Sequence, residues 1–347
     1  MIVREKQPVN LEMPFGTLDG FITPNERFYV RCHFPIPQID AKTWRLKIEG
    51  EVEMPFELSY AELLRMKSRT VGATLECAGN SRVFLMPRAK GAPWELGAVG
   101  NAEWTGVPLS AVLERAEMKA SATDVIFEGS DQGEIEEPPR PAGEIHYARG
   151  VPRDKALKDA LLAFKMNGGE LSPAHGFPVR VIVPGWYGMA PVKWLVRIVA
   201  SSQPFTGYFQ SIDYAYWERR GGLPVLVPIT ELQVKAEIAR PHKAEVLPAG
   251  AKYRLYGAAW TSGADVAKVD ISDDCGATWR PAKLLGKPVP NAWRLWEYEW
   301  QTPSEPGKQT LMARATDSRG RVQPNQHDAD LGGYLINHCL PIEVEVR

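Results

Sequence analysis

The stretch HGFPVRVIVPGWYGMAPVKWLVRIVAS (residues 175–201) sets our expectation for the first half of the chain. Two runs rich in β-branched residues, 179–185 and 192–201, are bounded by proline and glycine, as short strands usually are. Basic side chains recur along the stretch, namely His175, Arg180 and Lys193. The pattern predicts strands joined by stiff turns, with positive charge held close to them.

Two helices are predicted on the N-terminal side of this stretch. SYAELLRMK (59–67) begins with Ser59 and Glu62 at the spacing of a capping box. PRDKALKDALLAFKMNGG (152–169) repeats apolar residues every three or four positions, which predicts a longer helix ended by two glycines. The apolar face of this second helix would consist of Ala156, Leu157, Ala160, Leu161 and Phe164.

The second half of the chain has a different pattern, of short alternating segments. Runs such as YRLYGAAW and WRLWEYEWQ are typical of strands with one apolar and one wet face, and DDCG (273–276) is typical of a hairpin turn. Five or more such runs after residue 222 indicate an immunoglobulin-like sandwich. We place the boundary near RRGGLPVLVP (219–228) and predict two domains, 1–222 and 223–347.

Composition narrows the class of protein. The 347 residues carry a formal net charge of −1, which argues against a protein that binds nucleic acid or a membrane surface over its whole extent. The four cysteines are widely spaced and do not suggest a disulfide framework. The N-terminal residues contain no apolar signal core or twin-arginine pair. We expect a soluble, cytoplasmic protein, or a periplasmic one if a leader peptide has been removed.

The segment TLECAGNSR (74–82) holds one cysteine with no partner nearby. A thiolate is a soft metal ligand and needs positive charge or a metal to remain deprotonated. Gly79 leaves space for a bulky group near the backbone, and Arg82 supplies positive charge. Cys77 is therefore a candidate metal ligand, although a lone cysteine is more often buried and inert.

A second basic segment, FYVRCHFP (28–35), adds Arg31 and His33 to the basic residues of the first stretch. Guanidinium groups from distant segments suit an anionic cofactor that carries phosphate. The alternative is that each basic residue pairs with a carboxylate on the surface.

Six segments in order resemble the sulfite oxidase family of molybdenum enzymes. They are RFYVRCHFPIP, TLECAGNSR, GAPWELGAVGNAEWTGVPL, FEGSDQG, NGGELSPAHGFPVRVIVPGWYGMAPVKWLVRI and GAAWTSGADVAKVDISDDCGATWRPAKL. The resemblance runs from about residue 20 to the C-terminus. It implies an α+β fold, a mixed domain that holds molybdopterin, followed by the immunoglobulin-like sandwich, used for dimerisation.

The resemblance also implies roles for single residues. Cys77 falls at the position of the molybdenum ligand. The residues expected to hold the pterin and its phosphate are His33, Asp131, His175, Arg180 and Lys193. The residues expected around the reacting groups are Arg31, Arg82, Lys90, Trp94 and Tyr214.

The implied activity is oxidation of sulfite to sulfate by oxygen-atom transfer at a cysteine-ligated molybdenum–molybdopterin centre. Arg31, Arg82 and Lys90 would bind the sulfite anion. The resemblance also implies a homodimer. No haem, flavin or NAD motif is present, so we expect the electrons to pass to a separate acceptor, such as a c-type cytochrome. The sequence departs from the family at Cys32, often asparagine, and at Gly332, where the animal enzymes have an arginine.

Other functions remain open from the sequence. Nitrate reductases share the two domains, and methionine-sulfoxide reductases share the catalytic core without the sandwich. A non-enzymatic binding protein would be expected to lose Cys77 or the basic residues, and both are present.

Overall fold

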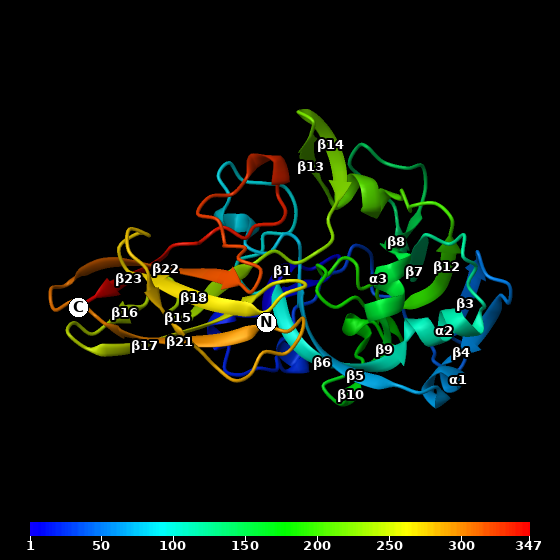
Figure 1. Ribbon diagram of the computed structural model, residues 1–347, viewed down its shortest axis with the longest axis horizontal. Coiled ribbons are helices and arrows are strands. Elements are labelled where there is room, and N and C mark those ends of the chain that lie inside the picture. Colours follow the sequence, from blue (N-terminus) through cyan, green and yellow to red (C-terminus); the bar gives the residue numbers. More distant parts are fainter.

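The computed structural model describes all 347 residues, arranged as two bodies along the long axis (Figure 1). Strands hold 41% of the residues and helices 12%. No helix is long and apolar enough to cross a membrane. A short hairpin of β1 (Ile2–Glu5) and β2 (Asn10–Glu12) begins the chain near the junction of the bodies.

The first body contains two five-stranded sheets that share a large hydrophobic core. The strands of one are β5 (Arg69–Glu76), β6 (Val99–Pro108), β9 (Leu161–Met166), β10 (Gly169–Glu170) and β11 (Arg180–Ile182). The strands of the other are β3 (Arg45–Gly50), β4 (Phe56–Ser59), β7 (Asp124–Gly133), β8 (Ile145–Pro152) and β12 (Leu195–Ser201). The first sheet is antiparallel throughout, and in the second only the β3–β12 pair is parallel.

The three α-helices of the first body are short: α1 (Tyr60–Arg65), α2 (Leu109–Arg115) and α3 (Arg153–Asp159). The predicted capping box of α1 is confirmed, because Ser59 and Glu62 cap each other's backbone amides. The strands predicted around the first stretch are confirmed as β11 and β12, each shorter than expected.

The predicted helix over 152–169 is wrong beyond Asp159. Residues 161–166 form β9, which pairs with β6 on one side and β11 on the other. The segment LLAF is buried all round, as in a central strand. A continuous apolar run does not distinguish a buried strand from a helix, and here pairing with two neighbours prevails.

The second body is built from two sheets. One has the order β15 (Lys235–Arg240), β17 (Lys252–Trp260), β21 (Arg294–Gln301) and β20 (Lys283–Leu284). The other has the order β16 (Val246–Leu247), β23 (Ile342–Val346), β22 (Gly307–Asp317), β18 (Val266–Ser272) and β19 (Arg280–Pro281). Side chains of both sheets form one apolar cluster, including Trp296 and Trp300, as their alternation predicted.

Two features join the bodies. A two-stranded ribbon of β13 (Ala215–Arg220) and β14 (Leu223–Pro228) projects near the top of Figure 1 and leads into the second body. Tyr256, Trp260 and Trp293 of the second body belong to the core of the first. The bodies therefore share a packed boundary.

Candidate functional site

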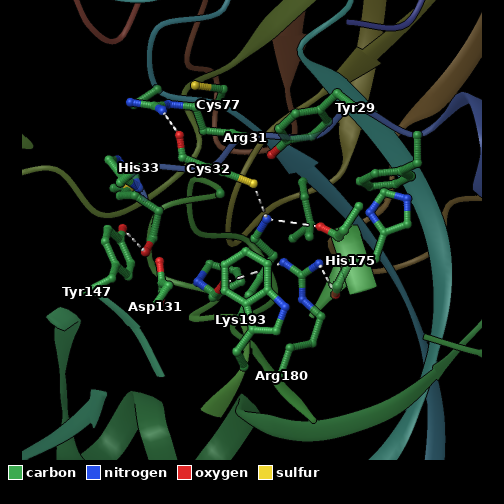
Figure 2. Close-up of a pocket in the computed structure, with 18 of the residues that line it drawn as sticks. Tyr29, Arg31, Cys32, His33, Cys77, Asp131, Tyr147, His175, Arg180 and Lys193 are labelled. Atoms are coloured by element: carbon green, nitrogen blue, oxygen red, sulfur yellow. Dashed lines mark hydrogen bonds between the residues drawn. The ribbon is translucent and has the colours of Figure 1, made fainter. Parts of the chain in front are cut away.

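A pocket in the first body gathers side chains from segments far apart in the sequence (Figure 2). Its polar and ionisable lining consists of Tyr29, Arg31, Cys32, His33, Cys77, Asp131, Tyr147, His175, Arg180, Lys193, Trp194 and Tyr214. Cys77 follows β5, Asp131 lies on β7, and Arg180 begins β11, so both sheets contribute to the lining.

Cys77 lies in a tight turn at the end of β5. Its amide donates to the Ala98 carbonyl at 2.9 Å, and its own carbonyl accepts from the Asn80 amide at 2.9 Å. Burial raises the pKa of the Cys77 thiol, while Arg82 and Arg31 act in the opposite direction. The thiol is therefore held in place but protonated, and a metal would favour its deprotonation.

Arg180 and His175 form a buried pair in the lining of the same pocket. The Arg180 Nη1 donates to the His175 carbonyl at 3.0 Å, and the guanidinium lies 4.9 Å from the centre of the Trp104 ring. Burial lowers the pKa of Arg180 to about 10. Burial, helped by Arg180, lowers the pKa of His175 to about 4, so this imidazole is neutral at physiological pH.

The Lys193 ammonium lies in the pocket between the Ala174 carbonyl and the Cys32 sulfur. Its Nζ donates to the Ala174 carbonyl at 3.0 Å and to Cys32 Sγ at 3.3 Å, as Figure 2 shows. Burial lowers the pKa of Lys193. Burial also raises the pKa of Asp131 to about 6, and its Oδ1 has no hydrogen-bond partner.

His33 and Tyr214 occupy another side of the pocket. The His33 Nε2 and the Tyr214 hydroxyl are 2.6 Å apart, and the His33 ring stacks on Tyr147 with centroids 4.6 Å apart. Burial, followed by the charge of Arg31, lowers the pKa of His33 well below its usual value. His33 is therefore neutral, and Tyr214, whose pKa burial raises, keeps its proton.

The positive charges of this pocket have no carboxylate at ion-pair distance. Arg31, Arg180 and Lys193 donate to backbone carbonyls, to the Asn10 amide oxygen or to Cys32 Sγ. The Arg180 Nε has no hydrogen-bond partner, like the Asp131 Oδ1. Buried charge without a counterion is costly. An anionic ligand with phosphate and a hydrogen-bonding ring system would satisfy these groups, so the lining fits a molybdopterin bound next to the Cys77 thiol.

Eight of the eleven predicted site residues line this pocket. They are Arg31, His33, Cys77, Asp131, His175, Arg180, Lys193 and Tyr214. The structure brings them together, and their individual roles stay predictions.

The structure places the other three outside the lining. Arg82 donates to the carbonyls of Gly333 and Ala92, both at 3.0 Å, beneath the Tyr334 ring. Lys90 has an 89% exposed side chain and pairs with Glu137 at 2.9 Å. Trp94 is fully buried in the apolar cluster that contains Cys77.

Sequence reasoning missed Tyr147 as a lining residue. It lies on β8, donates to the Met189 carbonyl at 2.7 Å and supports the His33 ring. A single aromatic residue in an alternating strand carries no signal that separates it from ordinary core. Tyr29, by contrast, lies within the segment that carried Arg31 and His33.

Comparison with known proteins matches both halves of the chain to described families. Residues 33–209 match the oxidoreductase molybdopterin binding domain, and residues 227–347 match the Mo-co oxidoreductase dimerisation domain. The chain therefore belongs to the sulfite oxidase family of molybdenum-dependent oxidoreductases. The resemblance drawn from the sequence is confirmed.

Individual relatives cover almost the whole chain. It is 36% identical to the sulfite oxidase of Gallus gallus over 93% of its length, spanning 72% of that protein. It is 32% identical to a nitrate reductase of Solanum lycopersicum, spanning 40% of that protein. The sulfane dehydrogenase SoxCD of Paracoccus pantotrophus has a similar structure, with a TM-score of 0.83 and 26% identity, over 98% of this chain and 85% of that one.

Proposed function

We propose that this protein oxidises sulfite to sulfate by oxygen-atom transfer, with molybdenum–molybdopterin bound in the pocket around Cys77. The observation that carries the proposal is the convergence of a buried thiol with Arg31, Arg180 and Lys193, cations that have no carboxylate partner. The similarity to sulfite oxidases supports the choice of substrate.

Different residues of the pocket would bind different parts of the cofactor. Cys77 would bind the metal, because a thiolate is a soft and strongly donating ligand. Arg180 and Lys193 would hold phosphate by charge-assisted hydrogen bonds, and His33, Asp131 and His175 would contact the ring system. The bound cofactor supplies the oxygen-atom transfer and accepts the electrons.

The remaining polar groups would bind the substrate and manage protons. Arg31 carries the positive charge that attracts a sulfite anion into the pocket. Tyr214 keeps its proton and lies 2.6 Å from the neutral His33, so it can donate to an anionic oxygen while the imidazole holds its ring in place. Arg82 lies outside the pocket lining and would affect the reaction indirectly, by supporting the turn that carries Cys77.

The second body would form a homodimer through an immunoglobulin-like sandwich, in line with the dimerisation family that matches residues 227–347. Electrons would pass from the pocket to a separate acceptor, such as a c-type cytochrome. Light scattering tests the first of these proposals: a mass twice that of the 38.6 kDa chain is expected, and a monomer at micromolar concentration would contradict it.

The decisive experiment measures molybdenum and pterin in the purified protein, then turnover with sulfite and an artificial electron acceptor. We expect about one metal per chain and sulfite-dependent reduction of the acceptor. Molybdenum-loaded protein that shows no turnover with sulfite, but reduces nitrate with a reduced dye as electron donor, would favour the nitrate reductase alternative. Protein that binds no molybdenum would reject both.

A further inference from the structure

A buried ion cluster lies where the two bodies meet, directly behind the Cys77 turn. Lys235 of β15 places its Nζ 2.9 Å from Glu76 Oε1 and 2.8 Å from Glu237 Oε1. It also donates to Ser81 Oγ at 3.0 Å, and Ser81 donates to Glu237 at 3.0 Å. We call these four residues, with Asn80, the seam cluster. Every member is at most 4% exposed.

The seam cluster connects the turn of Cys77 to the second body. Glu76 is the last residue of β5, and Asn80 and Ser81 lie in the turn that follows it, whereas Lys235 and Glu237 belong to β15. Trp260, at the end of β17, adds a hydrogen bond from Nε1 to Glu76 Oε2 at 2.8 Å. The residue before the metal ligand is thus held by two strands of the second body.

The turn needs such support. Ser81 has a left-handed backbone conformation, with φ of 75°, which a non-glycine residue adopts only where its surroundings hold it there. The Asn80 side chain accepts from the Ala98 amide at 3.0 Å and donates to Glu76 Oε1 at 3.2 Å. These contacts orient the backbone on both sides of Cys77.

Stability alone is a weak reason for this arrangement. Burial opposes the charge of Lys235, but Glu237 and Glu76 outweigh it and raise its pKa, so the ammonium stays charged. Well-packed apolar side chains of similar volume would often stabilise a boundary at least as well as buried ions do. What the ions add is direction, because each hydrogen bond fixes the angle and the distance of its partners.

We propose that Lys235 is a positioning residue for Cys77, through which the second body holds the metal ligand in its binding orientation. The proposal rests on the proposed function in one respect, that Cys77 is the metal ligand. Lys235 does not line the pocket, so it acts through Glu76 and Ser81 and does not touch the substrate.

The test uses full-length protein, produced without cofactor, and measures the alkylation rate of each cysteine by peptide mass spectrometry. Lys235→Met should raise the rate at Cys77 by about tenfold or more, while Cys32 and Cys339 keep their rates. Asp317→Asn is the control: it removes the charge of a buried carboxylate in the second body, which pairs with the partly exposed Arg321 at 2.7 Å and does not contact the turn. This control should leave the rate at Cys77 unchanged.

A variant with Glu76→Gln, Lys235→Met and Glu237→Gln covers the case in which the single variant fails to fold, because it leaves no buried charge unpaired. It should also expose Cys77. When loaded with cofactor, a folded variant of either kind should show a kcat lowered about tenfold and an unchanged KM for sulfite.

A folded Lys235 variant in which Cys77 reacts no faster than in the wild type would overturn the proposal. An equal rise at all three buried cysteines, which would mean general loosening, would also overturn it. Failure of the proposed function would be seen separately, as absence of molybdenum from the wild-type protein.

Discussion

Two of the regions that hold buried positive charge in this molecule, the seam cluster and the pocket, provide that charge with different partners. In the seam cluster, Lys235 lies between Glu76 and Glu237, so its counterions come with the fold. In the pocket, Arg180 and Lys193 donate hydrogen bonds only to carbonyls and a sulfur, and neither has a carboxylate partner. The comparison teaches that the polypeptide itself supplies carboxylates to the cation of the seam, although Glu237 Oε2 has no hydrogen-bond partner, whereas the cations of the pocket need negative charge from a ligand.

The largest expected effect removes the pocket's only predicted metal ligand. Cys77→Ser should abolish turnover, because an alcohol is a harder ligand than a thiol and ionises far less readily. The fold should survive, since the groups proposed to hold the pterin lie elsewhere. Activity and circular dichroism of the purified variant check this. Cys339→Ser, at a buried cysteine outside the pocket, should stay active. Full turnover of metal-loaded Cys77→Ser would contradict the assignment.

The next prediction sets the two regions directly against each other. Lys235→Met should destabilise the protein by about 3–5 kcal/mol, because it leaves two buried carboxylates without their shared cation. Arg180→Met in cofactor-free protein should cost no more than about 1–2 kcal/mol, since it removes a cation that has no counterion. Urea unfolding at pH 7 measures both free energies.

The same Arg180→Met variant sharpens the comparison when the cofactor is available. It should contain much less pterin than the wild type, because phosphate loses a charge-assisted contact. Equal destabilisation by Lys235→Met and Arg180→Met, with unchanged pterin content in the latter, would show that the two regions do not differ in the way described.

A smaller effect is expected at the residue between the regions. Arg82 touches Gly333 and Ala92 and lies beside the Cys77 turn. Arg82→Gln removes the charged hydrogen bonds to the carbonyls of these two residues, which support the turn of Cys77, and should cost about 1.5–3 kcal/mol, or roughly 10- to 150-fold in kcat/KM. Kinetics with molybdenum content measured alongside check this. An unchanged kcat/KM would remove Arg82 from the catalytic role predicted for it.

The sequence predicted the pocket better than the seam, for physical reasons. Soft and basic residues beside glycine and proline carry information about a ligand, so Cys77, His175 and Arg180 could be found from their segments. The alternation of Lys235 and Glu237 on β15 is typical of a wet strand face. Here the whole of Lys235–Ala239 is buried, because the first body covers that face. Only the packing of distant segments reveals such a cluster.

Secondary structure shows the same limit. The capping box of α1 is a local interaction, and local sequence predicted it correctly. The strand β9 depends on its partners β6 and β11, which lie elsewhere in the chain. Its apolar run therefore suggested the end of a helix. The residues of the run alone do not reveal that it pairs with two other strands.

The smallest expected effect concerns pH and the pocket's uncompensated charge. The pKa of His175 falls from an ordinary 6.5 to about 4, first by burial and then by Arg180. Between about pH 6.5 and pH 4, His175 is therefore protonated in the unfolded chain but neutral in the folded chain, so the free energy of unfolding falls as the pH drops through this range. At pH 5 this one residue should cost about 2 kcal/mol relative to pH 7.5. His175→Gln cannot take up the proton, so it should lose about 2 kcal/mol less than the wild type between these two pH values. Urea unfolding of both cofactor-free proteins at each pH measures the difference, and parallel losses would show that His175 titrates normally and that the pocket does not exclude positive charge.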